Sequence, residues 1–150
     1  MQTYKDPDSH LAKHHGSVRA NSTAIYFLMT CENVSHMHRI KSDEMWHFYL
    51  GGPMTVVELR EDGEAKCTVL GPDIFDKQNP QVVQYLVKKD TWFGSFPNPG
   101  SDYSFVGCTV APGFDFADFE LGDREKLLSE FPKATELITK LTYEPENHTI

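Results

Sequence analysis

The sequence contains no long hydrophobic run and no cluster of basic residues. A membrane-spanning helix needs about 20 consecutive apolar residues, so we do not expect a membrane protein. The 14 Lys and Arg residues are outnumbered by 22 Asp and Glu residues, which gives a formal net charge of -8. Because nucleic acids are bound through clustered Lys and Arg, a nucleic-acid partner is not expected either.

Cysteine is also scarce, and Cys31, Cys67 and Cys108 form no CxxC pair of the kind that binds zinc. Their odd number and apolar neighbours predict buried free thiols of a reducing compartment rather than disulfides. The first residues, MQTYKDPDSHLAKHH, lack the apolar stretch of a secretory signal. We therefore expect a cytoplasmic location.

The length of 150 residues is typical of one domain. Residues 6–23 are polar and predict an exposed loop or arm that contains His10, His14 and His15. From Thr23 onward, short β-rich runs are separated by turn sequences at the rhythm of roughly 8–12 residues that favours a β-sandwich or barrel. These runs are AIYFLM (24–29), MWHFYL (45–50), MTVVEL (54–59), AKCTVL (65–70), VVQYLV (82–87) and YSFVGCTV (103–110).

Helical patterns come only at the end of the chain. Asp123 is placed to cap one helix, and Pro132 suits the start of a second. Their apolar stripes are Leu127, Leu128 and Phe131, followed by Leu137, Ile138 and Leu141. This order excludes alternating βαβ units and predicts a β-barrel at 23–121, preceded by residues 1–22 and followed by helices and a tail at 122–150, all in one domain.

The most informative stretch contains His36, His38 and Glu44. Side chains at positions i and i+2 of a strand point to the same face, so both imidazoles can reach one ion. The five residues between His38 and Glu44 allow a turn that brings the carboxylate back on an antiparallel strand. Imidazole and carboxylate together suit Fe, Mn, Ni or Zn. Taken alone, the pattern also leaves open histidines that are simply hydrogen-bonded or at the surface.

In this stretch an HxH pair is followed by five residues and a Glu, and then by six residues and a Gly. This spacing resembles the first motif of the cupin superfamily. The runs SHMHRIKSDEMWHFYLGG, LGPDIF, WFGS and VGCTVAPGFDFADFEL are similar to one cupin family, described as sugar-epimerase-like and of uncertain function. The resemblance covers roughly residues 23–142. It implies an all-β cupin jelly-roll β-barrel with short C-terminal helices, commonly a homodimer, and an internal small-molecule pocket that faces His38 and Glu44.

Two features depart from the cupin pattern. Metal-binding cupins carry a second motif, close to PxGxxH, and in the corresponding stretch Phe93 stands where that histidine would be. His36, in turn, stands where the family often has a small residue. Family members also begin with a helix and a Gly-Gly-Tyr-Phe word, whereas the sequence from Gln2 resembles the interior of the strand that follows. Residues 1–22 are therefore expected to be a strand remnant followed by a loop.

Candidate catalytic residues come from the resemblance to enzymes that epimerise deoxysugar nucleotides with a His base, an acidic partner and a Tyr acid. Here His38 would remove a proton next to a carbonyl, and Glu44 would orient and tune that imidazole. Tyr26 or Tyr103 would serve as the acid. Hydroxyls that are hydrogen-bonded at the barrel surface are the alternative for both tyrosines.

Candidate ligand-binding residues follow from strand alternation, which directs Trp46 and Phe48 into the pocket. His47 then faces the opposite side. It belongs to the family word DEMWHF, however, so a pocket or interface role and a packed, hydrogen-bonded histidine both remain open. Trp92 and Phe93 either form an apolar platform against a sugar or another ring, or belong to the core.

The run from Pro112 to Glu120 alternates Phe with acidic residues. As a pattern it predicts an edge strand with Phe inward and with Asp115 and Asp118 mainly solvated, and we interpret it as a determinant of the fold and the dimer. Cys108 has apolar neighbours and no legible His or Asp partner, so it is expected to be a buried, inert thiol.

Three functions remain open from the sequence. The first is an isomerase or epimerase that acts on a sugar or a nucleotide-sugar-like carbonyl compound through His38 and Glu44. The second is a protein that binds a small ligand in the same pocket without turnover. The third is a metal-dependent cupin enzyme in which His36, His38 and Glu44 hold Fe, Mn, Ni or Zn.

Overall fold

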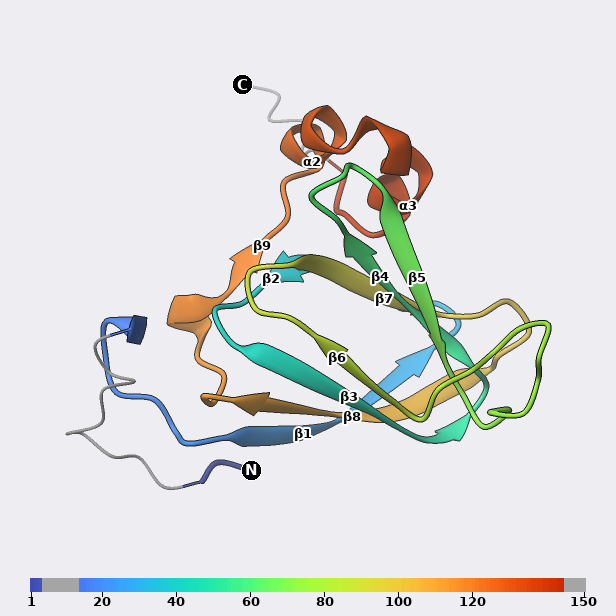
Figure 1. Ribbon diagram of the computed structural model, residues 1–150, viewed down its shortest axis with the longest axis horizontal. Helices are drawn as coiled ribbons and strands as arrows, with labels where there is room; N and C mark the ends of the chain where they lie inside the picture. The colour runs from blue at the N-terminus through green and yellow to red at the C-terminus, as the bar shows by residue number, and fades with distance from the viewer. Residues whose placement is uncertain (4–13, 145–150) are drawn as a thin grey trace.

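Two antiparallel β-sheets face each other in the computed structural model, which describes residues 1–3 and 14–144 (Figure 1). One sheet has the order β1-β8-β3-β6, and the other has the order β5-β4-β7-β2-β9. The strands are β1 (Thr23–Thr30), β2 (Ser35–Arg39), β3 (Asp43–Gly51), β4 (Met54–Leu59), β5 (Ala65–Leu70), β6 (Gln84–Val87), β7 (Trp92–Pro97), β8 (Tyr103–Ala111) and β9 (Glu120–Leu121). The expected all-β architecture is confirmed.

Neighbouring residues of β4 supply two different cores, because successive side chains of a strand point to opposite faces. Val56 faces the other sheet and belongs to the cluster between the sheets, whereas Val57 belongs to a second cluster beneath the C-terminal helices. Both valines are fully buried. The first cluster comprises Met29, Trp46, Met54, Val56, Leu70, Val87, Phe93, Val106 and Cys108. β4 therefore reads as a continuous apolar run because it is covered on both sides.

The C-terminal segment forms α2 (Arg124–Glu130), the 3-10 turn η2 (Pro132–Ala134) and α3 (Thr135–Lys140). The Asp123 side chain accepts a hydrogen bond from the backbone N–H of Lys126, so the expected N-cap is confirmed. Figure 1 shows both helices at one end of the five-stranded sheet. Their apolar side chains cover its outer face, which leaves the interior of the barrel to the strands.

The segment that follows β8 differs from the expected edge strand. It forms the 3-10 turn η1 (Phe116–Asp118), because the Asp115 side chain accepts a hydrogen bond from the N–H of Ala117 and starts a helical turn. Asp118 is buried rather than solvated. Its carboxylate accepts hydrogen bonds from Arg19 at 2.8 and 2.9 Å and lies 2.9 Å from Nδ1 of His15. These bonds outweigh the effect of burial and hold the pKa of Asp118 below its ordinary value.

The same cluster corrects the expectation of an exposed N-terminal arm at its described end. His15 and Arg19 are buried, whereas His14 is exposed; His10 lies outside the described residues. The expectation for cysteine was also wrong in part, since Cys31 and Cys67 are exposed and only Cys108 is buried. Apolar neighbours in sequence do not bury a residue that lies in the turn after a strand, such as Cys31, or that faces outward, such as Cys67. In the described part of the chain, no helix is long and apolar enough to cross a membrane.

Candidate functional site

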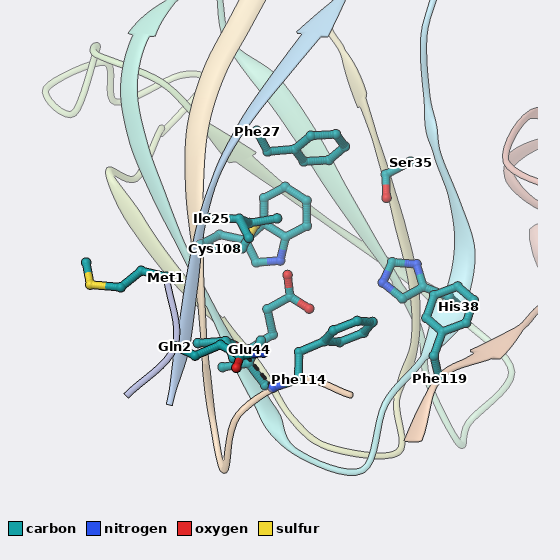
Figure 2. A pocket seen from close by; sticks show the side chains of 13 residues that line it. Met1, Gln2, Ile25, Phe27, Ser35, His38, Glu44, Cys108, Phe114 and Phe119 are labelled. Carbon is teal, nitrogen blue, oxygen red and sulfur yellow. Dashed lines mark hydrogen bonds between the residues drawn. The ribbon is translucent and has the colours of Figure 1, made fainter. Parts of the chain in front are cut away.

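A cavity of about 380 Å³ opens between the two sheets, on the inner face of the four-stranded sheet (Figure 2). Most of its wall comes from β1, β3 and β8, and β2 and the loop after β8 close the remaining sides. The lining residues are Met1, Gln2, Thr23, Ile25, Phe27, Ser35, His38, Glu44, Trp46, Cys108, Val110, Phe114 and Phe119. Apolar and aromatic side chains predominate, and a few polar groups converge among them, as in sites that bind small molecules.

Strand register places the polar groups of the four-stranded sheet side by side. Glu44 and Trp46 alternate on β3 and pair with Val110 and Cys108 of β8. Glu44 is only 8 % exposed, and burial raises its pKa to about 7, although a hydrogen bond with the Cys108 thiol opposes the rise. The carboxyl group therefore takes up or releases a proton near neutral pH.

His38 lies on the opposite side of the cavity from Glu44, with Phe119 beside it (Figure 2). Its Nδ1 is 2.7 Å from the backbone carbonyl of His36. Because a carbonyl only accepts, Nδ1 carries the proton and Nε2 keeps its lone pair in the neutral ring. Burial lowers the pKa of His38, and the bond to the carbonyl only partly opposes this shift. The imidazole is therefore neutral at pH 7, with Nε2 able to act as a base.

The expected orientation of His38 by Glu44 differs from the observed contacts. Among the described residues, the partner of the imidazole is the His36 carbonyl, and the carboxyl group of Glu44 bonds to Cys108. The two groups stand across the cavity instead of touching (Figure 2). A molecule bound between them would meet a base on one side and a carboxyl group on the other.

His36 does not share the cavity with His38. In a regular strand, residues three positions apart point to opposite faces. The pairing of β2 with β7 shifts by one residue between Ser35 and His38, and both residues therefore line the cavity. This bulge changes the parity of the strand. His36 stacks on the ring of Tyr143, with the centroids 3.7 Å apart. The expectation that both imidazoles point to one ion was therefore wrong.

The donors present do not fit the metal site of a cupin. Among the described residues, no group of three or more His, Cys, Asp and Glu side chains could hold a metal ion. Of the expected ligands, His36 packs elsewhere, and Phe93 occupies the position of the additional histidine. The ring of Phe93 is buried 4.2 Å from that of His38. We therefore derive no chemical step through a metal.

Tyr26 points away from the cavity. It is 78 % exposed on the outer face of the four-stranded sheet, where its ring contacts those of Tyr49 and Phe105. Tyr103 is also exposed and does not line the cavity. The expectation of a tyrosine acid was thus wrong for both residues, because they occupy the wrong alternation positions of β1 and β8.

His47 also faces outward, as alternation predicts. Its Nε2 is 3.0 Å from the hydroxyl of Thr109, and its Nδ1 is 3.1 Å from the side-chain nitrogen of Gln84. This arrangement matches a packed, hydrogen-bonded histidine, and His47 is not among the cavity residues.

Of the expected aromatic ligand-binding residues, Trp46 lines the cavity. Phe93 belongs to the core between the sheets and Phe48 packs against that core, and neither is among the cavity residues. Trp92 lies on the other face of its sheet, where the guanidinium of Arg39 sits 4.6 Å from the ring centroid. The interpretation of Trp92 and Phe93 as a ligand platform was therefore wrong, since adjacent positions of β7 point to opposite faces.

Several cavity residues were absent from the sequence prediction. Ile25 and Phe27 flank Tyr26 on β1 and point to the opposite face. Assigning that face of β1 to the interior would have predicted both residues. Phe114 and Phe119 reach the cavity from the loop around η1, which has no period to reveal them. Cys108 was expected to be a buried, inert thiol; it is buried, and its pKa is raised by burial and by the nearby Glu44.

The arrangement of strands and cavity agrees with the comparison with known families. The family model described as Cupin superfamily (DUF985) matches residues 1–122. The chain belongs to the cupin superfamily.

Two proteins that resemble this cupin are each 34% identical to it. An uncharacterized protein of Saccharomyces cerevisiae, YML079W, is 34% identical over 125 residues, and the match covers 79% of this chain but only 61% of that protein. Protein SO0799 of Shewanella oneidensis has a crystal structure that matches with a TM-score of 0.80 and 34% identity, over 97% of this chain and 86% of the other. These similarities support the cupin jelly-roll fold.

A more distant structure, a dTDP sugar isomerase from Desulfovibrio desulfuricans, has a TM-score of 0.58 and 15% identity. The match covers 73% of this chain and 68% of that chain. At this level of identity the similarity concerns the fold alone.

Proposed function

We propose that this cupin binds a small carbonyl compound in the barrel cavity and acts on it as an isomerase or epimerase. The observation that carries the proposal is the placement of His38 and Glu44 on opposite sides of a largely apolar cavity. His38 offers an unprotonated Nε2, and Glu44 exchanges its proton near neutral pH. Two such groups suit the removal of a proton next to a carbonyl and its return from another direction.

Burial also supports this chemistry. The aromatic walls limit water, so a hydrogen bond to an oxygen of the bound molecule is stronger than in solution. The other polar groups of the wall are few, and sugar hydroxyls would find few partners there. The sugar or nucleotide-sugar class of substrate therefore stays a prediction from the sequence.

Deuterium exchange tests the proposal. The protein is incubated in heavy water with a panel of ketones and keto-sugars, and loss of the proton signal next to each carbonyl is followed by NMR. We expect at least one compound to exchange, and His38→Gln to slow that exchange by about 10²–10⁴-fold, the range for loss of a general base. His36→Gln, at a residue that stacks on Tyr143 outside the cavity, is the matched control and keeps the rate. Absence of His38-dependent exchange across the panel would contradict the proposal.

A second candidate is a protein that holds a small ligand without turnover, and the predominance of apolar wall favours it. Native mass spectrometry of freshly purified protein separates the two. A retained metabolite that is released unchanged, together with no exchange in heavy water, would replace catalysis by binding.

We also propose a homodimer formed through the outer face of the four-stranded sheet. Tyr26, Tyr49 and Phe105 pack together there, and Tyr26 and Leu28 are mostly exposed. Such a patch is typical of a contact with another protein. Sedimentation should show a dimer for the wild type and a monomer for Tyr26→Lys, with Lys66→Glu as a control away from this patch. A wild-type monomer at micromolar concentration would contradict the dimer.

The cytoplasmic location stays a prediction.

A further inference from the structure

The indole N–H of Trp46 has no hydrogen-bond partner among the described residues. Trp46 is 1 % exposed, and it lines the cavity from the centre of β3. Buried tryptophan N–H groups nearly always find an acceptor, because an unpaired buried donor loses its bond to water without compensation. An orphaned donor in the wall of a cavity therefore marks a position where a ligand supplies the acceptor.

Three other polar groups of the wall are bonded within the protein. The carboxyl group of Glu44 bonds to Cys108, and Nδ1 of His38 bonds to a backbone carbonyl. The hydroxyl of Thr23 accepts a hydrogen bond from the N–H of Phe114. The Ser35 hydroxyl and the Gln2 amide can donate or accept, whereas the buried Trp46 N–H is strictly a donor and has no partner among the described residues.

The charge of the wall restricts the acceptor. Among the cavity residues that the structure describes, none is Lys or Arg, and the N-terminal ammonium of Met1 is held 2.8 Å from the carbonyl of Ala24. The guanidinium of Arg19 lies outside the lining and is held by Asp118. A phosphate or carboxylate would therefore meet no basic side chain and an ammonium group that already has a partner, and it would lie in the same apolar cavity as the Glu44 carboxyl group, which is unfavourable. The acceptor that suits the site is an uncharged oxygen.

We infer that the ligand is a small, uncharged carbonyl compound with an apolar body, and that its carbonyl oxygen accepts a hydrogen bond from the Trp46 indole N–H. The apolar body matches walls formed by Phe27, Val110 and Phe114. A sugar nucleotide matches them poorly, because its many hydroxyls and its phosphates would lose water against these walls and gain few partners. This inference deepens and rests on the proposed function, since it identifies the carbonyl beside which His38 would act.

In the reaction, the C–H bond next to the carbonyl breaks and its proton passes to Nε2 of His38. The electron pair of that bond forms a carbon–carbon double bond, and the π pair of the carbonyl moves to the oxygen. The Trp46 N–H stabilises the negative charge that develops there. Return of the proton to carbon restores the carbonyl, so no oxidant or further reactant is needed.

Indole NMR signals provide a test that does not depend on turnover. The chain has two tryptophans, Trp46 and Trp92, so the ¹⁵N-labelled protein gives two indole N–H signals, which Trp92→Phe assigns. The probes are cyclohexanone and acetophenone, with methylenecyclohexane as the analogue without oxygen, and with pyruvate, fructose and cyclohexylamine as anionic, hydroxylated and cationic probes.

We expect the ketones to shift the Trp46 signal in a saturable manner while the Trp92 signal stays in place. Methylenecyclohexane should bind at least tenfold more weakly than cyclohexanone. Trp46→Phe should weaken ketone binding at least tenfold, and Trp92→Phe should leave it unchanged. The wild-type shift keeps the test decisive even if Trp46→Phe does not fold.

The inference is overturned if the ketones bind without moving the Trp46 signal, or if pyruvate, fructose or cyclohexylamine binds more tightly than the ketones. Its failure is distinct from that of the proposed function. Ketone binding through Trp46 without His38-dependent exchange would remove the catalytic proposal and leave the recognition intact. His38-dependent exchange that Trp46→Phe leaves unchanged would remove the role of Trp46 and leave the catalysis.

Discussion

The two faces of β3 carry different chemistry on adjacent residues. Glu44 and Trp46 face the cavity and are buried, whereas His47 and Tyr49 face outward, where His47 is held at the hydroxyl of Thr109. Residue types on the two faces are similar, since each has an ionisable group beside an aromatic ring. The position along the strand, rather than the residue type, therefore decides which side chains can meet a ligand.

β2 shows where this rule fails. A regular strand would put His36 and His38 on one face, but the bulge directs His36 to Tyr143 and leaves Ser35 and His38 on the cavity side. One extra residue on the strand is enough to divide an apparent metal motif into an inner base and an outer stacking contact.

The largest expected difference between the two faces is in stability. Trp46→Ala should lower the free energy of unfolding by about 3–5 kcal/mol, because it leaves a void between the sheets. Tyr26→Ala removes an equally prominent aromatic side chain from the outer face and should cost less than about 1 kcal/mol. Urea unfolding followed by circular dichroism, at a protein concentration where the chain is monomeric, measures both. Equal losses would show that the outer face contributes as much as the inner one.

A second difference concerns the pH dependence of stability. Burial raises the pKa of Glu44 from its ordinary 4.5 to about 7, so the folded protein keeps a proton that the unfolded chain releases. The free energy of unfolding therefore falls as the pH rises between these two pKa values. Above about pH 7 the destabilisation caused by Glu44 no longer changes with pH. The full loss is about 3 kcal/mol, at about 1.36 kcal/mol per pKa unit.

Glu44→Gln should remove this loss. Between pH 4 and pH 8, the free energy of unfolding of the variant should therefore rise relative to that of the wild type by about 3 kcal/mol. The control is Glu120→Gln, at an exposed glutamate that pairs with Arg39. Unfolding free energies in urea at both pH values provide the measurement. A difference between wild type and Glu44→Gln that does not change with pH would contradict a raised pKa.

The smallest expected effect is kinetic and compares two thiols. Cys31 is exposed, whereas Cys108 is buried beside Glu44, and both burial and that carboxylate raise its pKa. In a Cys67→Ser background, a disulfide reagent at pH 8 should modify Cys31 at least about 100-fold faster than Cys108, because the thiolate is the reactive form. Denaturant should make the two rates equal. Rapid modification of both thiols in the native protein would mean that the cavity wall opens readily.

Much of the fold was predictable because it rests on local patterns. Most of the alternating strands, the Asp123 cap and the late helices are predicted by these patterns, and so is the inward direction of Glu44 and Trp46, which precede the register shift of β3 between Phe48 and Leu50. Phe114 and Phe119 were not placed at the cavity, since an irregular loop has no period from which to infer direction. Asp118 was expected in solvent, because its partners His15 and Arg19 lie about a hundred residues earlier in the chain.

Local sequence patterns establish where strands, turns and helix ends occur, and the resemblance to cupins places His38 and Glu44 on two strands that follow each other in the sequence. These features depend on interactions among residues a few positions apart. The packing of distant segments decides that His36 leaves the cavity, that Tyr26 is outside it, and that Trp46 enters it without a hydrogen-bond partner among the described residues. The reason is that a bulge, a strand's inward face and an orphaned donor depend on pairing with distant parts of the chain.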